Sequence, residues 1–204
     1  TGLIVAALVA LRLLFVCRRS CDRKAANPAG KEKKTTVAFF HPYANSGGGG
    51  ERVLWLAIQA LVQSKKPLHI SIYTGDVDSA EAIFDRTCNR FGVSFAFENR
   101  PTFVRLKFRQ LLEASQWPRF TMIGQSFGSM VVAFESLLRH TPDVFIDTTG
   151  FAFSFPIARL AGCKVAAYVH YPTISTDMLQ RVVSKRPTYN NDSSISSSWT
   201  RTRV

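Results

Sequence analysis

A run of four glycines, Gly47 to Gly50, is the first feature of this sequence that could bind a ligand. It stands between an apolar run typical of a strand, TVAFF, and a long helical run, ERVLWLAIQALVQ. A turn without side chains lets backbone N–H groups and the positive end of the following helix approach an anion, so we expect a phosphate or pyrophosphate there. The run is neither GxGxxG nor a Walker loop, and the alternative is a flexible surface connection. Glu51 follows it, where its carboxylate would favour the helix dipole or bind a sugar hydroxyl.

Two of the four histidines end expected strands, His41 in HPY and His170 in HYP. Parallel sheets place their sites beyond the carboxyl ends of the strands, where an imidazole could contact a reacting sugar. We take His170 as the candidate catalytic residue and the neighbouring Tyr171 as a candidate for substrate binding. The alternative for both histidines is an imidazole bonded to nearby backbone. The sequence has no HExxH, DxD or paired CxxC, so we predict no bound metal.

The segment GQSFG at 124–128 matches the GxSxG nucleophile elbow, and Asp147 and His170 follow it in the order that hydrolases use. The spacing is short for a hydrolase, because Asp147 lies on the very next expected strand. We therefore expect a tight strand-to-helix turn that lines the cleft, with Gln125, Ser126 and Asp147 as substrate-binding candidates. An α/β serine hydrolase that uses Ser126 is the alternative.

Residues 100–119 carry a net charge of +4 and interleave aromatic side chains with cations. That mixture suits a segment at a membrane surface, where aromatic rings enter the acyl region and cations bind phosphates. An ordinary solvated helix that packs by its apolar side is the alternative, and a non-catalytic membrane-surface module is an alternative function for the whole chain. The candidate membrane-surface residues are Phe103, Arg105, Lys107, Phe108, Arg109 and Trp117.

From Thr36 onward, short β-branched or aromatic runs alternate with helical ones. Such alternation predicts βαβ units, hence an α/β fold with a Rossmann-like, mostly parallel sheet. The six runs expected as strands are TVAFF, LHISIYTG, VSFAF, RFTMIG, DVFIDTT and KVAAYVHY.

The formal charge of +12 on 204 residues invites a nucleic-acid-binding interpretation. The excess lies on the flanks, however: +6 on residues 1–35 and +3 on 184–204, against +3 on 36–183. This distribution argues against a nucleic-acid partner and for a chain held near a membrane.

The apolar run at 3–17 is about 22 Å long as a helix, short of the roughly 30 Å of a bilayer core. The chain begins with Thr1 rather than Met, so we expect 1–17 to be the C-terminal part of a transmembrane anchor. Basic residues follow it at once, which would place the remainder in the cytosol. We expect a basic linker at 18–35, a Rossmann-like domain at 36–183 and a polar loop or disordered tail at 184–204.

Several motifs together resemble one family: HPYANSGGGGERVLW, YTGD, GQSFGS, PDVFIDTTGFAF and YVHYPTISTDML. The sequence resembles the N-terminal half of the α-1,2-mannosyltransferases of asparagine-linked glycosylation. The resemblance implies a retaining, metal-independent glycosyltransferase of the GT-B type that moves mannose from GDP-mannose to a dolichol-pyrophosphate-linked oligosaccharide. In that comparison Gly47 to Gly50 with Glu51 match the glycine loop at the cleft, and His170 matches a histidine near the transferred sugar.

The resemblance also implies a second, donor-binding domain, which we expect to be absent from residues 184–204. We therefore expect an incomplete form that is inactive alone, from a single-pass protein of the endoplasmic reticulum membrane whose catalytic part is cytosolic. The expected partners are GDP-mannose, the lipid-linked oligosaccharide, the membrane and other mannosyltransferases of the pathway, with no cofactor. Whether retention proceeds by front-face displacement or through a covalent intermediate stays open.

Overall fold

The computed structural model describes residues 2–26, 34–170 and 180. The strands in this part are Thr35–Phe40 (β1), Leu68–Thr74 (β2), Thr102–Arg105 (β3), Val144–Asp147 (β4) and Lys164–Ala167 (β5). The helices are Gly2–Ala26 (α1), Gly49–Gln63 (α2), Ala80–Phe91 (α3), Thr121–Arg139 (α4) and Ser154–Leu160 (α5). Short 3₁₀ turns occur at Phe97–Asn99, Arg109–Leu112 and Ala114–Gln116.

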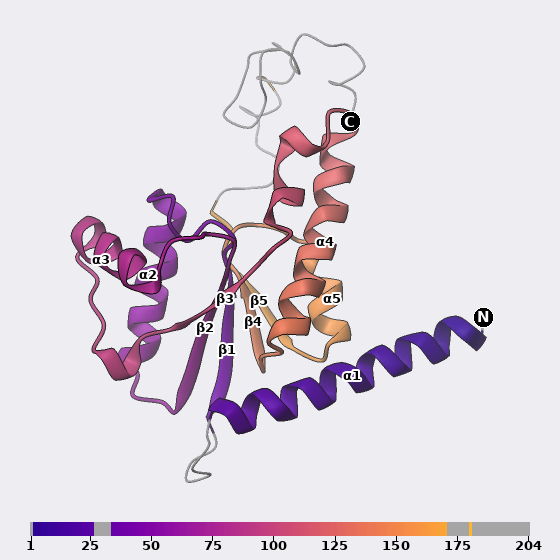
Figure 1. Ribbon diagram of the computed structural model, residues 1–204, viewed down its shortest axis with the longest axis horizontal. Coiled ribbons are helices and arrows are strands. Elements are labelled where there is room, and N and C mark those ends of the chain that lie inside the picture. Colours follow the sequence, from indigo (N-terminus) through magenta and orange to yellow (C-terminus); the bar gives the residue numbers. More distant parts are fainter. Residues whose placement is uncertain (1, 27–33, 171–179, 181–204) are drawn as a thin grey trace.

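The strands form one sheet in the order β3-β2-β1-β4-β5, and every pair is parallel. In the register of the central strands, Val37 of β1 pairs with Ile70 of β2 on one side and with Val144 of β4 on the other. The predicted α/β class with a parallel, Rossmann-like sheet is thus confirmed. The carboxyl ends of the strands share the edge that lies uppermost in Figure 1.

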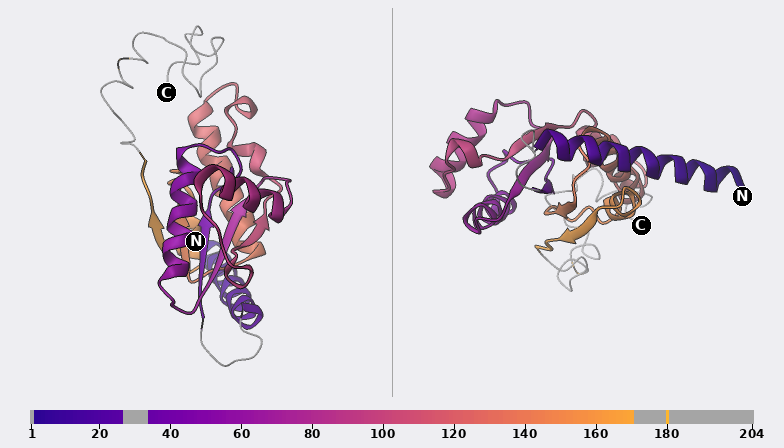
Figure 2. Two further views of the ribbon diagram at one scale, coloured as in Figure 1. Left: turned by 90° about the vertical axis from the view of Figure 1, so that its left-hand side faces the viewer. Right: turned by 90° about the horizontal axis from the view of Figure 1, so that it is seen from below.

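Helices cover both faces of this sheet, α2 and α3 on one and α4 and α5 on the other (Figures 1 and 2). Successive side chains of β1 point to opposite faces of the sheet, which explains the two cores. Val37 and Phe39 pack with α2 and α3, whereas Ala38 and Phe40 pack toward α4 and α5. All four side chains are at most 5% exposed, as expected for a central parallel strand covered on both faces.

Two of the six expected strands are wrong. The run VSFAF contains no strand; Val93 and Phe95 instead pack from a connecting segment against the core beneath α2 and α3. The strand that pairs with β2 is β3, which lies inside the segment expected to be interfacial. Apolar character alone cannot distinguish a paired strand from a loop that fills a core, because both bury the same side chains.

The other wrong strand is RFTMIG, since α4 already begins at Thr121 and runs through the whole GQSFG segment. Gly124 and Gly128 therefore form no turn; spaced four apart, they lie on one face of the helix. A Cβ on Gly124 would lie 2.3 Å from Cδ2 of Trp117, and one on Gly128 would lie 2.2 Å from the carbonyl oxygen of Leu111. The two glycines allow the preceding segment to pack directly against the helix backbone.

The first helix is longer than expected, because residues 18–26 continue α1 instead of beginning a linker. Its second half docks on the domain through Phe15, which is fully buried and meets the ring of Phe134 edge-on at 5.9 Å. Arg19 donates to the carbonyl oxygen of Ala161 at 2.7 Å, and Arg23 forms an ion pair with Asp143. These contacts hold the helix along the α4 and α5 side, with its N-terminal half extending away (Figure 1).

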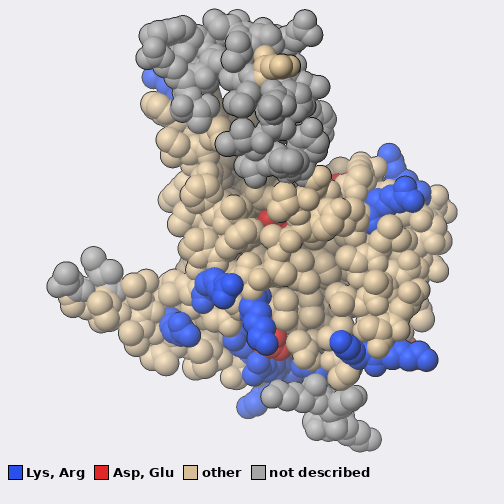
Figure 3. All heavy atoms as spheres, turned by 180° about the vertical axis from the view of Figure 1, so that it is seen from behind, with Lys and Arg blue, Asp and Glu red and all other residues tan. Residues whose placement is uncertain are grey.

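The apolar face of that N-terminal half is exposed, and Leu3, Val5, Leu8 and Leu13 are 46–89% accessible. Within the described residues, no helix combines the length and the hydropathy needed to cross a bilayer. The transmembrane assignment of 1–17 therefore stays a prediction. Lys and Arg side chains gather near the lower end of the molecule, where α1 joins the domain (Figure 3).

Candidate functional site

Two histidines meet at the carboxyl edge of the sheet, and Thr148 connects them. His41 follows β1 and is 2% exposed, and its Nδ1 lies 2.7 Å from the hydroxyl oxygen of Thr148. His170 follows β5, and its Nε2 lies 2.9 Å from the carbonyl oxygen of Thr148. A carbonyl oxygen only accepts, so Nε2 of His170 carries the proton, which leaves Nδ1 of the neutral ring as an acceptor. Thr148 follows β4 directly, and the sequence reasoning missed it, although its position after an expected strand was a usable signal.

The glycine turn faces the same two rings. A Cβ on Gly50 would lie 3.7 Å from Cε1 of His41 and 3.7 Å from Cε1 of His170, so Gly50 lies between the imidazoles. The tertiary structure therefore brings the turn and both candidate histidines into one cluster, which we call the histidine cluster: His41, Gly50, Glu51, Thr148 and His170.

Glu51 is the charged member of this cluster and is 6% exposed. One carboxylate oxygen accepts from the backbone N–H of Gly48 at 2.6 Å, and the other lies 3.8 Å from Nε2 of His41. Burial by itself would raise the pKa of Glu51, but the interactions with His41, with backbone N–H and with Ser46 lower it to about 2. The carboxylate thus stays ionised and caps the first turn of α2.

The four glycines of the turn do not share one backbone conformation. Only Gly47 has a positive φ, +77°, whereas Gly48 is extended at φ −87° and ψ −172°. A Cβ on Gly49 would meet nothing within 4 Å, so the turn is open on that side. Of the glycines after Gly47, Gly49 thus leaves open space, and Gly50 allows the two imidazoles to approach the turn.

The hydrolase constellation is not assembled in the described residues. Asp147 is fully buried, and its carboxylate accepts from the backbone N–H groups of Thr149 and Gly150 at 3.0 and 2.9 Å. The hydroxyl of Ser126 donates to the carbonyl oxygen of Met122 within α4. Gln125 donates to the carbonyl oxygen of Leu112 at 2.8 Å. These contacts stabilise local structure, and a role of the three residues in substrate binding stays a prediction. Tyr171 lies outside the described residues.

Four of the six candidate membrane-surface residues make contacts within the domain, and the other two are exposed. Phe103 packs between the rings of Trp55 and Phe84. Arg105 donates to the backbone oxygens of Asp76 and Asp78. β3 and the 3₁₀ turns fold this segment onto the domain, and its contact with a membrane stays a prediction.

Two further members of the set also bind within the domain. Arg109 pairs with Asp76 at 3.3 Å, and Trp117 donates to the carbonyl oxygen of Leu111 at 2.8 Å. Lys107 and Phe108 alone keep exposed side chains, and the Phe108 ring is 52% accessible.

A different apolar surface is exposed at the start of α4, which the sequence analysis did not identify. Its side chains are 58–70% accessible, an unusual set of large apolar residues to leave in water. Their helical spacing was hidden because the segment was expected to be a strand. We call this set the α4 apolar surface: Phe120, Met122, Ile123 and Phe127.

Comparison with known proteins decides the family. Residues 34–204 match the family described as "ALG11 mannosyltransferase N-terminus", which is most of the chain. The chain belongs to this family. The described part of the matched region holds the whole parallel sheet, the glycine turn and the histidine cluster.

Curated relatives agree with the family and are much longer than this chain. The chain is 48% identical over 189 residues to a protein of Xenopus laevis named GDP-Man:Man(3)GlcNAc(2)-PP-Dol alpha-1,2-mannosyltransferase. Proteins of the same name from Mus musculus and Homo sapiens are 44% and 42% identical. These matches cover 90–96% of this chain but only 38–41% of the relatives. The chain thus spans about two fifths of their length. The family that it matches describes the N-terminal part of such proteins.

Proposed function

We propose that the complete protein transfers α-1,2-linked mannose from GDP-mannose to a dolichol-pyrophosphate-linked oligosaccharide on the cytosolic face of the endoplasmic reticulum. In this proposal the chain forms the acceptor-side domain. The observation that carries it is the identity of 42–48% to mannosyltransferases whose names state these substrates, over nearly the whole chain. The remaining three fifths of such a protein would supply the donor-binding part.

The histidine cluster supports a role of the sheet edge in the transfer. His170 is exposed, and its ring is fixed by the bond to Thr148 and by the edge-on ring of Tyr168 at 4.7 Å. The free Nδ1 can accept a hydrogen bond from a sugar hydroxyl and orient it. The open side of the glycine turn at Gly49 leaves room for an anionic group of a substrate near the positive end of α2.

The α4 apolar surface supports membrane association of this domain. A lipid-linked acceptor keeps its dolichol in the bilayer, so the domain must work at the membrane surface. Ile123 and Phe127 are one helical turn apart and are 68% and 58% exposed. The absence of a metal requirement, the single-pass anchor and complexes with other mannosyltransferases stay predictions of the same proposal.

Transfer of radioactive mannose from GDP-mannose to a purified lipid-linked acceptor by the complete protein tests the activity. We expect His170→Ala to lower kcat by about 10²- to 10⁴-fold, the usual effect of a positioned polar group in catalysis. The matched control is His69→Ala, at the opposite end of the sheet on β2. Loss of activity with a collapsed thermal transition would instead make His170 a purely structural residue.

Co-sedimentation with lipid vesicles tests the membrane surface. We expect Ile123→Ser combined with Phe127→Ser to weaken vesicle binding by about tenfold or more, because each removes an exposed apolar side chain from the bilayer contact. Leu56→Ser on α2, 43% exposed, is the matched control on the other face of the sheet. Equal binding of both variants would place the membrane contact elsewhere.

A further inference from the structure

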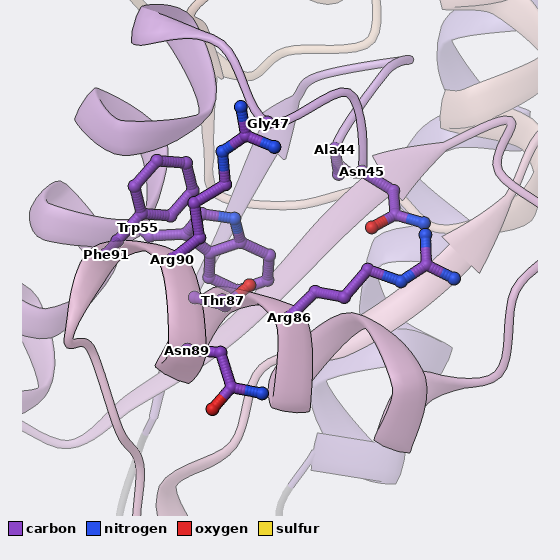
Figure 4. A pocket seen from close by; sticks show the side chains of 9 residues that line it. All are labelled: Ala44, Asn45, Gly47, Trp55, Arg86, Thr87, Asn89, Arg90 and Phe91. Atoms are coloured by element: carbon purple, nitrogen blue, oxygen red, sulfur yellow. The ribbon is translucent and has the colours of Figure 1, made fainter.

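A cavity of about 260 Å³ lies on the α3 side of the glycine turn (Figure 4). Trp55 and Phe91 form its apolar wall, Gly47 lies above them, and the side chains of Arg86 and Arg90 come from α3 at its rim. No member of the histidine cluster lines it. The cavity is therefore a separate feature from the site proposed for mannose transfer.

The wall of the cavity contains an unused hydrogen-bond donor. Trp55 is fully buried and contacts the rings of Phe84, Phe95 and Phe103 at centroid distances of 6.0–6.3 Å. Its indole nitrogen is buried and finds no acceptor among the described residues. Buried Trp N–H groups nearly always have a partner, because an unpaired donor costs about 1–3 kcal/mol. Figure 4 shows this nitrogen on the side of the ring that faces the Arg90 side chain.

Arg90 is the second donor, and its guanidinium lies against Gly47. A Cβ on Gly47 would lie 2.4 Å from Nη1 of Arg90, so the guanidinium packs directly over the turn. Gly47 also has a positive φ of +77°, which a side chain would strain. Arg90 forms no ion pair with any carboxylate of the described residues, whereas Arg86 pairs with Asp78 at 2.8 Å. The guanidinium of Arg90 thus places a positive charge near the unpaired indole N–H of Trp55.

We propose that this cavity binds a phosphate monoester, with the indole N–H of Trp55 and the guanidinium of Arg90 as its donors. A phosphate offers several acceptor oxygens in different directions, so one group can bind both a planar arginine fork and an indole that lies on another side. The apolar wall of Trp55 and Phe91 receives the carbon part of the ligand. The phosphate can come from a soluble metabolite or from a lipid headgroup.

A ligand in this cavity would affect the neighbouring glycine turn. A bound phosphate would hold Arg90 and Gly47 in place, and the turn at Gly47 leads directly into the first turn of α2, where Glu51 caps the helix. The site would therefore order the backbone that borders the histidine cluster. The binding itself does not depend on mannose transfer and is measured without it.

Indole ¹⁵N–¹H spectra of the chain test the soluble source, because the sequence has only three tryptophans. On titration with inorganic phosphate or glycerol 3-phosphate at constant ionic strength, we expect the Trp55 signal to move downfield and saturate. Trp117 already donates to Leu111, so its signal is an internal reference and should not move. Trp55→Phe assigns the signal, and its thermal transition reports whether the fold is kept.

Variants of exposed residues test the donor set without risk to the core. Arg90→Gln should weaken phosphate binding by about tenfold or more, since it removes a charge-assisted hydrogen bond. Arg159→Gln, on the exposed surface of α5 across the sheet, is the matched control and should leave the affinity unchanged. Equal weakening in both variants would mean general attraction of anions and would overturn the proposal.

Vesicles distinguish the second source. Phosphatidylcholine vesicles with and without phosphatidic acid, whose headgroup is a phosphate monoester, are compared for the wild-type chain and Arg90→Gln. Dependence on Arg90 that appears only with phosphatidic acid assigns the site to a lipid headgroup, and a Trp55 shift with soluble phosphate assigns it to a metabolite. If the Trp55 signal does not respond to phosphate and vesicle binding does not depend on Arg90, the proposal is refuted.

Discussion

Replacement of Glu51 by glutamine is the most direct test of how the glycine turn is held. The side chain keeps its shape, but the charge that caps α2 and faces His41 is lost. A pKa lowered from 4.5 to about 2 corresponds to about 3 kcal/mol of stabilisation of the ionised form in the folded state. We therefore expect Glu51→Gln to lower the free energy of unfolding by up to about 3 kcal/mol at neutral pH.

The pH dependence gives this prediction a second observable. Because the folded-state pKa of Glu51 is lowered, its contribution is complete above the unfolded-state pKa and is lost as the pH falls toward the folded-state value. The difference between wild type and Glu51→Gln should thus shrink from about 3 kcal/mol near pH 7 to about 1 kcal/mol near pH 3.

Urea unfolding followed by circular dichroism over this pH range measures both quantities. Glu81→Gln is the matched control, since Glu81 also lies in a first helical turn, that of α3, but is exposed. We expect its effect to stay within about 0.5 kcal/mol, as for a surface substitution. A Glu51→Gln effect of that size, or one that stays constant with pH, would refute the argument that buried hydrogen bonds hold this carboxylate ionised.

Two further substitutions test the packing of α4 and the docking of α1. Gly128→Ala should destabilise the chain by about 1–3 kcal/mol in thermal unfolding, because its Cβ would meet the Leu111 backbone at 2.2 Å. Gly49→Ala, whose Cβ meets nothing within 4 Å, should be neutral, and equal effects would contradict the close approach. Asp143→Asn should speed hydrogen exchange in the last turns of α1 and cost about 1–3 kcal/mol, since Asp143 pairs with Arg23 and accepts from Thr36. Burial by itself would raise the pKa of Asp143, but these partners lower it, so we expect the contribution to fade as the pH falls below about 4. Unchanged exchange in α1 would mean that other contacts hold the helix.

The sequence by itself determined the class of fold and the edge of the sheet at which the candidate site lies. Strands β1, β2, β4 and β5 were predicted because their β-branched and aromatic runs alternate with helical ones, a pattern set by local backbone preferences. Parallel strands share one carboxyl edge, so His41, His170 and the glycine turn were all expected at that edge, but the strand order β1-β4-β5 decided that they meet. These features depend on periodicity, which is readable along the chain.

The tertiary structure decided the features that depend on which surfaces meet. GQSFG looks like a turn in sequence, yet Gly124 and Gly128 are helical, and their missing side chains let Trp117 and Leu111 pack against α4. Only the tertiary structure shows that Arg105, one of the cations of residues 100–119, donates to the loop after β2. The unpaired N–H of Trp55 and the bond of Thr148 to two histidines are equally invisible along the chain. Each is a contact between residues distant in sequence, and no local pattern encodes the partner of a side chain.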